Sequence, residues 1–518
     1  MNTMLSRRFA AAAVLMGMLA LLSGCGTNPV TGETELQFIS TTQEIRMGEQ
    51  AYFPTRQVQG GDYVVHPDVT AYVRSVNQRL TAVAHRDLPF EIFVLNSSVP
   101  NAWAMPGGKM AINRGLLVKL QSEAELAAVL GHEIVHSAAR HSAQAQERGM
   151  LLQGGLVAVQ VAAAGSDYRD LIAGGSMLGA QLVSTKYGRD AELEADLYGM
   201  QYMFEAGYNP AAAIDLQQTF VSLSEGRQSN WLDGLFASHP PSQARVERNR
   251  ATASRLGGSE LEYGRQRYRR AMAPLLQDQA AYDAHDAALK AAANKQYQEA
   301  DRLADKAIRL QPREARFHGL KGDLARVTEK YQSATRHDDK AIARYPEYFA
   351  FHLQKGLALR ELGRAEPAVA SLRRSNDLLP NPIAQKLLGD FALLEGNRNA
   401  ALSYYQSAAG SQSPYGEEAR VALARLQLEE KPGKFLKSAL ARDAQGRIVI
   451  VVRNDSPVAV TNVEVGAAYF DANGRQLSEA QRYRVRGSLP AGKQASVVTR
   501  LQEVNGLRAA VLSARIAE

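Results

Sequence analysis

Residues 122–141 read SEAELAAVLGHEIVHSAARH, and the fold predicted for the first part of the chain depends on this stretch. Ser122 and Glu125 have the spacing of a capping box, and apolar residues recur after them at helical intervals. The pattern predicts a helix that begins after Ser122. Gly149 is its expected stop.

Two histidines and a glutamate of this helix form an HExxH pattern. His132 and His136 lie four residues apart on nearly one helical face, so both imidazoles can reach the same ion. Glu133 is rotated by about 100° from His132 and can address a water on that ion. Zinc held this way lowers the pKa of water to about 7 and polarises a peptide carbonyl, while the carboxylate moves the proton. The HExxH pattern also arises by chance on amphipathic helices. A third metal ligand elsewhere in the sequence is needed to distinguish a zinc site from a chance match.

The candidate third ligand lies in residues 189–196, RDAELEAD, at the start of a helix expected to end near Gly207. Glu192 and Asp196 are four residues apart and share a face. One carboxylate can bind zinc while the other accepts a hydrogen bond from a ligand histidine and fixes its tautomer. Glu194 points to another face of the helix.

HExxH followed by an ExxxD helix resembles the zincin peptidase family that includes the heat-shock protease HtpX and the CAAX prenyl protease. The resemblance is strongest to the periplasmic, repeat-containing beta-barrel assembly-enhancing members. It implies an α+β zincin-like metallopeptidase domain over residues 25–255, of the gluzincin type, with one zinc ion per chain. By the resemblance, His132, His136 and Glu192 bind zinc, Glu133 moves the proton and Asp196 supports a ligand histidine.

His239 is a further candidate, in the segment SHPPSQAR of residues 238–245. The family has a similar His-Pro segment followed by an arginine, so the resemblance places His239 near the metal. Two functional roles stay open: donating a hydrogen bond to the oxyanion of the tetrahedral intermediate, or binding zinc as a removable fourth ligand. The second role would make the resting enzyme latent. A plain loop histidine is the remaining interpretation.

The N-terminus predicts a secretory signal over residues 1–24, because two arginines precede an apolar run at residues 9–22. It resembles a bacterial lipoprotein signal that would acylate Cys25 and attach the chain to a membrane. Cys25 is the only cysteine, so no intramolecular disulfide can form. Gly26 after it resembles the default sorting to the outer membrane, which would place the enzyme in the periplasm. An incidental cysteine beside an ordinary cleavage site is the alternative.

A chain of 518 residues is too long for one core, and its formal net charge of +7 is too diffuse to indicate a nucleic-acid partner. Residues 102–105 and 110–112 flank a Pro-Gly-Gly turn and predict a hairpin. An exposed edge strand there would pair with an extended substrate, or the hairpin only closes the sheet. The apolar stretches 149–165 and 171–183 are too short to span a bilayer. They are interpreted as core helices or as a mobile lid.

An internal repeat occupies residues 281–426. Pro312, Pro346, Pro380 and Pro414 recur every 34 residues, the period of tetratricopeptide repeats. About four repeats would form an all-α solenoid with a concave, protein-binding surface, or a rigid spacer. By the resemblance, the repeats dock the enzyme on the outer-membrane protein assembly machinery, and the substrates are misfolded or stalled envelope proteins.

Residues 432–518 change to a strand pattern, at 447–453, 463–470 and 494–501, which predicts a small all-β sandwich. No chemistry is visible in it. The rival interpretation of the whole chain is a latent or non-catalytic chaperone or assembly scaffold that acts through its repeats. Retention of Glu133 beside all three ligands favours the peptidase, since a scaffold needs no proton acceptor there.

Overall fold

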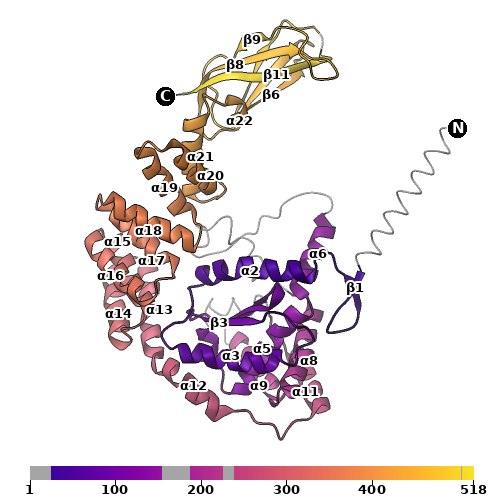
Figure 1. Ribbon diagram of the computed structural model, residues 1–518, viewed down its shortest axis with the longest axis vertical. Helices are drawn as coiled ribbons and strands as arrows, with labels where there is room; N and C mark the ends of the chain where they lie inside the picture. The colour runs from indigo at the N-terminus through magenta and orange to yellow at the C-terminus, as the bar shows by residue number, and fades with distance from the viewer. Residues whose placement is uncertain (1–24, 154–186, 226–238, 503, 518) are drawn as a thin grey trace, which may run out of the picture. The chain divides into compact units, whose positions relative to one another are not determined.

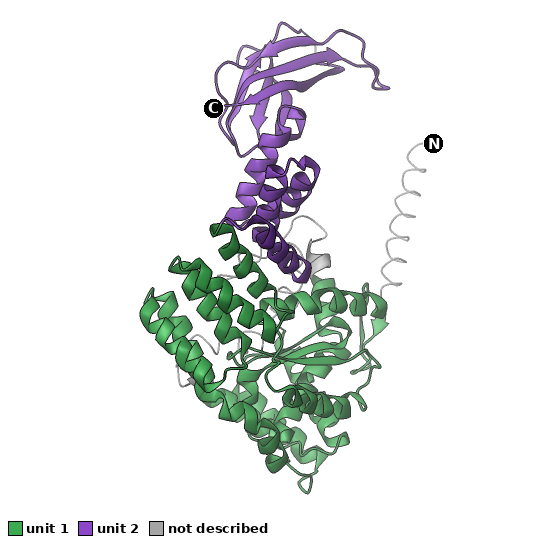
Figure 2. Cartoon of the chain, turned by 60° about the vertical axis from the view of Figure 1, so that its left-hand side comes forward, with its two compact units in different colours: residues 1–164, 175–362 green, residues 165–174, 363–518 purple. Residues whose placement is uncertain are grey.

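The computed structural model describes residues 25–153, 187–225, 239–502 and 504–517, which form two compact units, one up to Leu362 and one from Gly363 (Figures 1 and 2). The predicted signal peptide and most of the apolar stretches 149–165 and 171–183 lie outside the described residues. Within the described ranges, no helix combines the length and the apolar character that a membrane span requires.

A three-stranded sheet lies at the centre of the first unit, in the order β3-β5-β4. Strand β5 (Lys109–Asn113) runs parallel to β3 (Glu91–Leu95) and antiparallel to β4 (Ala102–Met105). The predicted hairpin is therefore confirmed, with β4 at the edge. Its turn is a single 3-10 turn over Pro106–Gly108, in which Gly107 has φ +77°. Gly107 passes so close to helix α2 (Thr41–Val58) that a Cβ on it would lie 2.5 Å from Ile45 Cα.

Helices cover both faces of this sheet, because successive apolar residues along its strands point to opposite faces. Leu95, Trp103 and Met105 face Tyr52 of helix α2 (Thr41–Val58). The opposite face packs in the larger core against α3 (Pro67–Thr81) and α5 (Glu123–Ala138), and it consists of Ile92, Val94, Ala102, Ala104, Met110 and Ile112. The β4 side chains are all buried, so the expectation of an exposed edge strand is wrong for its side chains.

The helix that carries HExxH ends at Ala138, so the predicted stop at Gly149 is wrong. Arg140 adopts φ +62°, a left-handed conformation that breaks the helix, and α6 (His141–Gln153) begins directly after it. The buried Arg140 guanidinium lies 2.6 Å from Glu35 and 2.8 Å from Glu44. These ion pairs offset the strain of a non-glycine residue at this φ. Glu35 belongs to β2 (Thr34–Leu36), which pairs with β1 (Cys25–Thr27), so residues 25–36 form a short hairpin that is fixed to this helix break.

Three further helices complete the shell around the sheet: α8 (Arg189–Glu205), α9 (Ala212–Glu225) and α11 (Gln243–Leu256). A connecting helix, α12 (Arg265–Gln277), then leads to the repeats. The core of the sheet and its helices continues into this later part of the chain through Tyr268, Met272, Leu275, Tyr282 and Phe317.

The repeat region consists of paired helices, and every second one begins at or just after one of the regularly spaced prolines. Small residues at the predicted repeat spacing are fully buried between the paired helices, for example Ala300, Ala334 and Ala368. The first unit holds α13 (Gln279–Ala293), α14 (Tyr297–Leu310), α15 (Ala315–Val327), α16 (Tyr331–Arg344) and α17 (Phe349–Glu361), and the second holds α18 (Ala365–Leu378), α19 (Pro382–Leu394), α20 (Arg398–Ala409) and α21 (Pro414–Gln427).

Two antiparallel three-stranded sheets close the second unit, in the orders β10-β7-β6 and β11-β8-β9. Ile450 and Val452 of one sheet share a core with Val463 and Val465 of the other. The predicted multidomain fold class, with a zincin-like α+β domain, an all-α repeat region and a β-sandwich, is confirmed. The strands are β6 (Leu436–Arg442), β7 (Ile448–Asn454), β8 (Val460–Tyr469), β9 (Gln481–Arg484), β10 (Gln494–Val498) and β11 (Leu507–Ile516).

Candidate metal centre

The centre forms where helices α5 and α8 touch through two glycines. A Cβ on Gly199 would lie 2.9 Å from the backbone nitrogen of His132, and a Cβ on Gly131 would lie 2.9 Å from the Gly199 carbonyl oxygen. No side chain fits between the helices there. The HExxH face of α5 is therefore held against the ExxxD face of α8.

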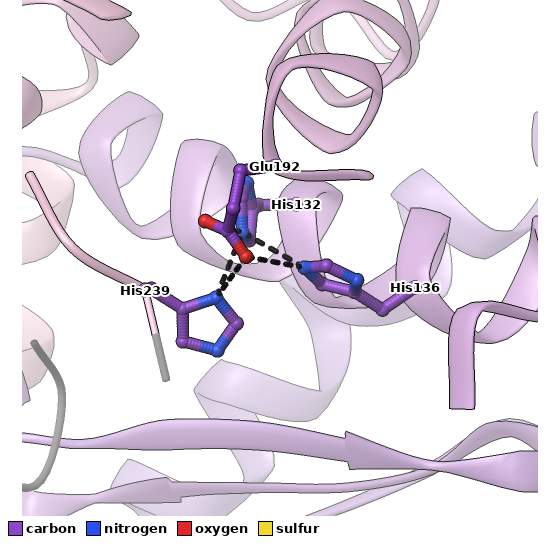
Figure 3. Close-up of side chains that lie close together, drawn as sticks. All are labelled: His132, His136, Glu192 and His239. Atoms are coloured by element: carbon purple, nitrogen blue, oxygen red, sulfur yellow. Dashed lines mark hydrogen bonds and ion pairs between the residues drawn. The ribbon is translucent and has the colours of Figure 1, made fainter. Parts of the chain in front are cut away.

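Four side chains from these helices and from the His-Pro segment converge on one point (Figure 3). One atom from each of His132, His136, Glu192 and His239 lies within 4.8 Å of the others. The Nε2 atoms of His132 and His136 are 3.1 Å apart, and His239 Nδ1 lies 3.2 Å from His132 Nε2 and 2.9 Å from Glu192 Oε1. All four predicted residues thus reach one place from three segments of the chain.

This arrangement favours a cation between the ring nitrogens. Asp196 accepts a hydrogen bond from His132 Nδ1, so in the neutral His132 ring the Nε2 atom carries the lone pair, and it lies 3.1 Å from His136 Nε2. Burial lowers the pKa of His132, but hydrogen bonds to Asp196 and Glu192 outweigh burial and raise it to about 10. The cluster therefore attracts positive charge. Three nitrogens and a carboxylate oxygen are the donors that zinc takes in proteins, so the residues present fit this ion.

Asp196 and Arg245 hold the ligands from behind. His132 Nδ1 donates to Asp196 Oδ1 at 3.0 Å, and Arg245 binds both oxygens of Asp196 at 2.7 Å. Arg245 also lies 3.0 Å from Glu192 Oε2. Burial raises the pKa of Asp196, but the Arg245 charge and hydrogen bonds outweigh burial, so the pKa of this carboxyl is lowered. The pKa of Glu192 is lowered too, against burial, by His239 and the other histidines. Both carboxylates are ionised.

Comparison with known proteins identifies the domain that carries this centre. Residues 67–253 match the model of Peptidase family M48. We refer to this segment as the M48 domain because of that similarity. The predicted resemblance to HExxH/ExxxD zincins is confirmed, and the family implies a metal.

Several curated relatives align with the M48 part of the chain. The mitochondrial metalloendopeptidase OMA1 of Schizosaccharomyces pombe is 33% identical over 226 residues, which cover 42% of this chain and 64% of the relative. The beta-barrel assembly-enhancing protease of Escherichia coli is 29% identical over 257 residues, 47% of this chain and 51% of the relative. Metalloprotease LoiP of E. coli is 27% identical over 45% of this chain and 92% of its own length. The chain thus spans between half and two thirds of the first two relatives.

Solved structures with some likeness to the chain include two helical proteins. The Arabidopsis OM64 TPR domain is 21% identical, with a TM-score of 0.22, over 23% of this chain and 98% of its own. MamA is 18% identical, with a TM-score of 0.25, over 28% of this chain and 86% of its own.

The M48 domain contains a supporting pair that the sequence analysis missed. His141 Nδ1 lies 2.7 Å from His136 Nδ1, and His141 Nε2 lies 3.4 Å from Glu194 Oε1. The sequence offers His141 no partner at a spacing that indicates a site. In a helix that continued to Gly149, His141 would lie about 140° around the axis from His136. The break at Arg140 instead turns His141 back toward His136.

Tyr187 was also missed, and nothing in its sequence context indicates it. Its ring stacks on His136 with centroids 3.9 Å apart and an angle of 17° between the planes. Its hydroxyl lies 2.7 Å from Ser142 Oγ, and burial raises the pKa of Tyr187, so the hydroxyl stays neutral. Tyr187 fixes the orientation of one imidazole of the M48 centre.

Glu133 stands beside the cluster rather than in it. The side chain is buried; Oε1 lies 3.5 Å from His239 Nε2, and Oε2 has no hydrogen-bond partner among the described residues. A cavity of about 40 Å³ adjoins Glu133, His132 and His239. A cavity needs only about 10–15 Å³ of such space to hold a water molecule, so this one is large enough for water beside Glu133. The free carboxylate oxygen is thus in place to accept a proton.

Proposed function

We propose that this chain is a zinc-dependent endopeptidase of the bacterial cell envelope that degrades misfolded or stalled outer-membrane proteins. The observation that carries the catalytic part is the convergence of His132, His136 and Glu192 beside the free carboxylate oxygen of Glu133. The envelope and the substrates are supported by the similarity to the beta-barrel assembly-enhancing protease. The name of that relative is the basis for the location and the substrates proposed for this chain.

In this proposal His132, His136 and Glu192 hold the zinc ion. When bound, zinc supplies a Lewis acid that lowers the pKa of water to about 7 and polarises the scissile carbonyl. Glu133 accepts a proton from the attacking water and returns it to the leaving amine. Asp196 and Arg245 keep the His132 ring in the tautomer that leaves Nε2 free to bind.

The edge of the sheet offers the substrate a place to bind. Asn113 N–H donates to Asn101 O at 2.8 Å, which makes this residue pair a hydrogen-bonded one in the antiparallel ladder. By alternation, the backbone groups of Ala102 and Ala104 point away from β5. Strand β4 has no strand partner on that side among the described residues. An extended peptide can pair there largely without regard to its sequence, as a peptidase of varied misfolded clients requires.

His239 makes the resting enzyme latent in this proposal. Its Nδ1 points into the ligand cluster, 2.9 Å from Glu192 Oε1, and its Nε2 lies 3.5 Å from Glu133 Oε1. This orientation supports the fourth-ligand role over the oxyanion role. A substrate would then have to displace His239 before the open zinc position becomes available.

The repeats and the N-terminus give the proposed place of action. The paired helices would dock the enzyme on the outer-membrane protein assembly machinery, and a lipid on Cys25 would anchor it to the outer membrane from the periplasm. Mass spectrometry of the mature N-terminus tests the anchor. An unmodified Cys25 or cleavage elsewhere contradicts it.

The decisive experiment compares the wild type with Glu133→Gln on an unfolded β-barrel protein. We expect equal zinc content and equal thermal stability, with cleavage lost by at least a hundredfold, because a general base contributes about 10²–10⁴-fold. Glu247→Gln, an exposed change on α11, is the matched control and should cleave normally. Unchanged turnover in Glu133→Gln would overturn the mechanism. Binding of clients by a zinc-loaded wild type that never cleaves them would favour the scaffold.

A further inference from the structure

The positive charge of the chain is concentrated in the C-terminal sandwich. Residues 432–518 contain thirteen lysines and arginines against seven aspartates and glutamates, an excess of six within a whole-chain net charge of +7. The interpretation of this charge as diffuse is therefore wrong. The remaining 431 residues are almost neutral in sum.

One face of the β11-β8-β9 sheet points away from the core, and the strand register defines it. On the central strand β8, Val463, Val465 and Ala467 pack in the core of the sandwich. The alternate residues Glu464, Gly466 and Ala468 must then face outward. Two of these three have very small side chains, so the middle of the face is shallow except where Leu512 covers Gly466.

Arginines line both sides of this shallow centre. On β9, Tyr483 packs toward the core, so Arg482 and Arg484 face outward opposite Gly466 and Glu464. On β11, Arg508 lies opposite Ala468. Alternation past the buried Val485 and Ala514 adds two more arginines. We call the set the cationic face, and it consists of Arg482, Arg484, Arg486, Arg508 and Arg515.

The charges of the cationic face are exposed and mostly unpaired. All five arginines are exposed. Arg482 lies 3.5 Å from Glu464, and the other four make no ion pair with any described residue. Leu512 projects from the same face over Gly466 and is 41% exposed. Exposed, unpaired arginines contribute little to folding, so an external partner accounts for them better than the stability of the sandwich does.

We propose that the cationic face binds the surface of a bilayer that contains anionic phospholipids. A flat face with arginines on two flanks matches a plane of phosphate groups, whereas a pocket would be needed to select one carboxylate. Leu512 can enter the boundary between headgroups and acyl chains. An anionic bilayer surface attracts a cluster of basic residues by about 1 kcal/mol for each lysine or arginine near it. The inference concerns the sandwich alone and does not depend on the proposed peptidase activity.

Vesicle co-sedimentation tests the proposal with the chain from residue 25 onward carrying Cys25→Ser, so that acylation cannot contribute. We expect binding to vesicles of phosphatidylcholine mixed with phosphatidylglycerol, little binding to phosphatidylcholine alone, and loss of binding as salt is raised. Replacing Arg482, Arg484 and Arg508 by glutamine should weaken binding on the order of a hundredfold, because each arginine near an anionic surface contributes about fivefold.

The matched control carries Arg309→Gln, Arg336→Gln and Arg373→Gln, three exposed arginines of the repeat helices. It has the same net charge as the test variant and should bind as the wild type does. Equal weakening of both variants would show that only net charge matters and would overturn the proposal. So would equal binding to neutral vesicles. Polyglutamate is the competing probe: if the test variant loses polyglutamate but keeps the vesicles, the face serves an acidic protein instead.

Discussion

Each of the two ligand histidines is held through its second ring nitrogen, but by partners of different chemical type. His132 is backed by Asp196, whose negative charge is itself bound by Arg245. His136 is backed by the imidazole of His141, with Glu194 behind it. A carboxylate makes the first ring more basic, whereas an imidazole mainly orients the second. We therefore infer that His132 contributes more to metal affinity and His136 more to the geometry of the site.

At the residue scale, replacing His239 separates its two proposed roles. In His239→Ala we expect hydrolysis of a short unstructured peptide to rise on the order of tenfold. The substrate would no longer have to displace His239, and a displacement free energy of about 1.4 kcal/mol corresponds to this factor. Initial rates at saturating zinc measure this effect. His337→Ala, in helix α16, is the control and should leave the rate unchanged. A lower rate with full zinc content would assign His239 to the oxyanion instead.

The metal ligands could be predicted from the sequence, whereas several of the residues that orient them could not. His132, His136 and Glu192 follow from spacing on two helices and a family resemblance, and the structure places them together. His141 depends on a left-handed residue between two helices, which no periodicity reveals. Tyr187 approaches the centre from a segment that carries no motif at all. Such supports depend on three-dimensional packing, so a single sequence cannot show them.

At the element scale, the metal centre depends on the contact of α5 and α8. In Gly199→Ala the new methyl group would press on the backbone nitrogen of His132. This backbone is held inside helix α5 and cannot move aside as the end of a flexible side chain could. We expect a loss of about 1–3 kcal/mol in unfolding free energy, from overpacking, and weaker zinc binding. Urea unfolding of the metal-free protein and zinc titration measure the two effects.

Gly188→Ala is the matched control for this substitution. Gly188 is the N-cap residue of the same helix, and a Cβ there would meet nothing within 4 Å. It should leave the zinc affinity unchanged. Equal effects of the two substitutions would show that the glycine contact does not position the ligands.

A second element-scale prediction concerns Asp338, a buried carboxyl in helix α16 with no hydrogen-bond partner among the described residues. Burial and the neighbouring Asp323 raise the pKa of Asp338 to about 9. The folded-state pKa therefore exceeds the unfolded value of about 3.9. The helix pair is most stable below the lower value and loses stability as pH rises toward the higher one. Gly322 provides the space beside this carboxyl, which explains a glycine inside a repeat helix.

Asp338→Asn should remove this pH dependence. We expect the variant to melt at a higher temperature than the wild type at pH 8 and at nearly the same temperature at pH 4. Thermal unfolding followed by circular dichroism at both pH values measures the difference. Asp339→Asn, its exposed neighbour, is the control. A gain of equal size at pH 4 and pH 8 would contradict an ionisation effect.

Helices of the repeats were predictable from the sequence because a 34-residue period recurs in prolines and small residues. The sandwich was predictable only in part. Strands β7, β8 and β10 are rich in β-branched residues and were expected. Strands β6, β9 and β11 contain few or no β-branched residues and lack that signal. The outward arginines of β9 and β11 belong to the cationic face.

At the scale of the whole molecule, the peptidase core extends well beyond residue 255, where its predicted domain ends. Tyr268, Met272 and Leu275 of α12 are buried in the same core as the HExxH helix. The backbone of Tyr263 accepts a hydrogen bond of 3.0 Å from Ala124 N–H, in the first turn of α5. The first repeats are attached as well, since Gln57 of α2 bonds both Glu347 O and Phe349 N.

This organisation predicts opposite behaviour for two truncated chains. A chain of residues 26–255 loses three buried side chains of α12 that contribute about 1.5–3 kcal/mol each, a sum comparable to the whole stability of a domain. We expect it to aggregate or to show no cooperative unfolding. A chain of residues 26–362 keeps the complete first unit and should melt in one transition, with zinc bound. Calorimetry and zinc analysis of both chains measure the outcome. If the chain of residues 26–255 is soluble and binds zinc, the peptidase domain ends at residue 255 as the sequence predicts. Two separate transitions in the chain of residues 26–362 would show that the first repeats fold independently of the M48 domain.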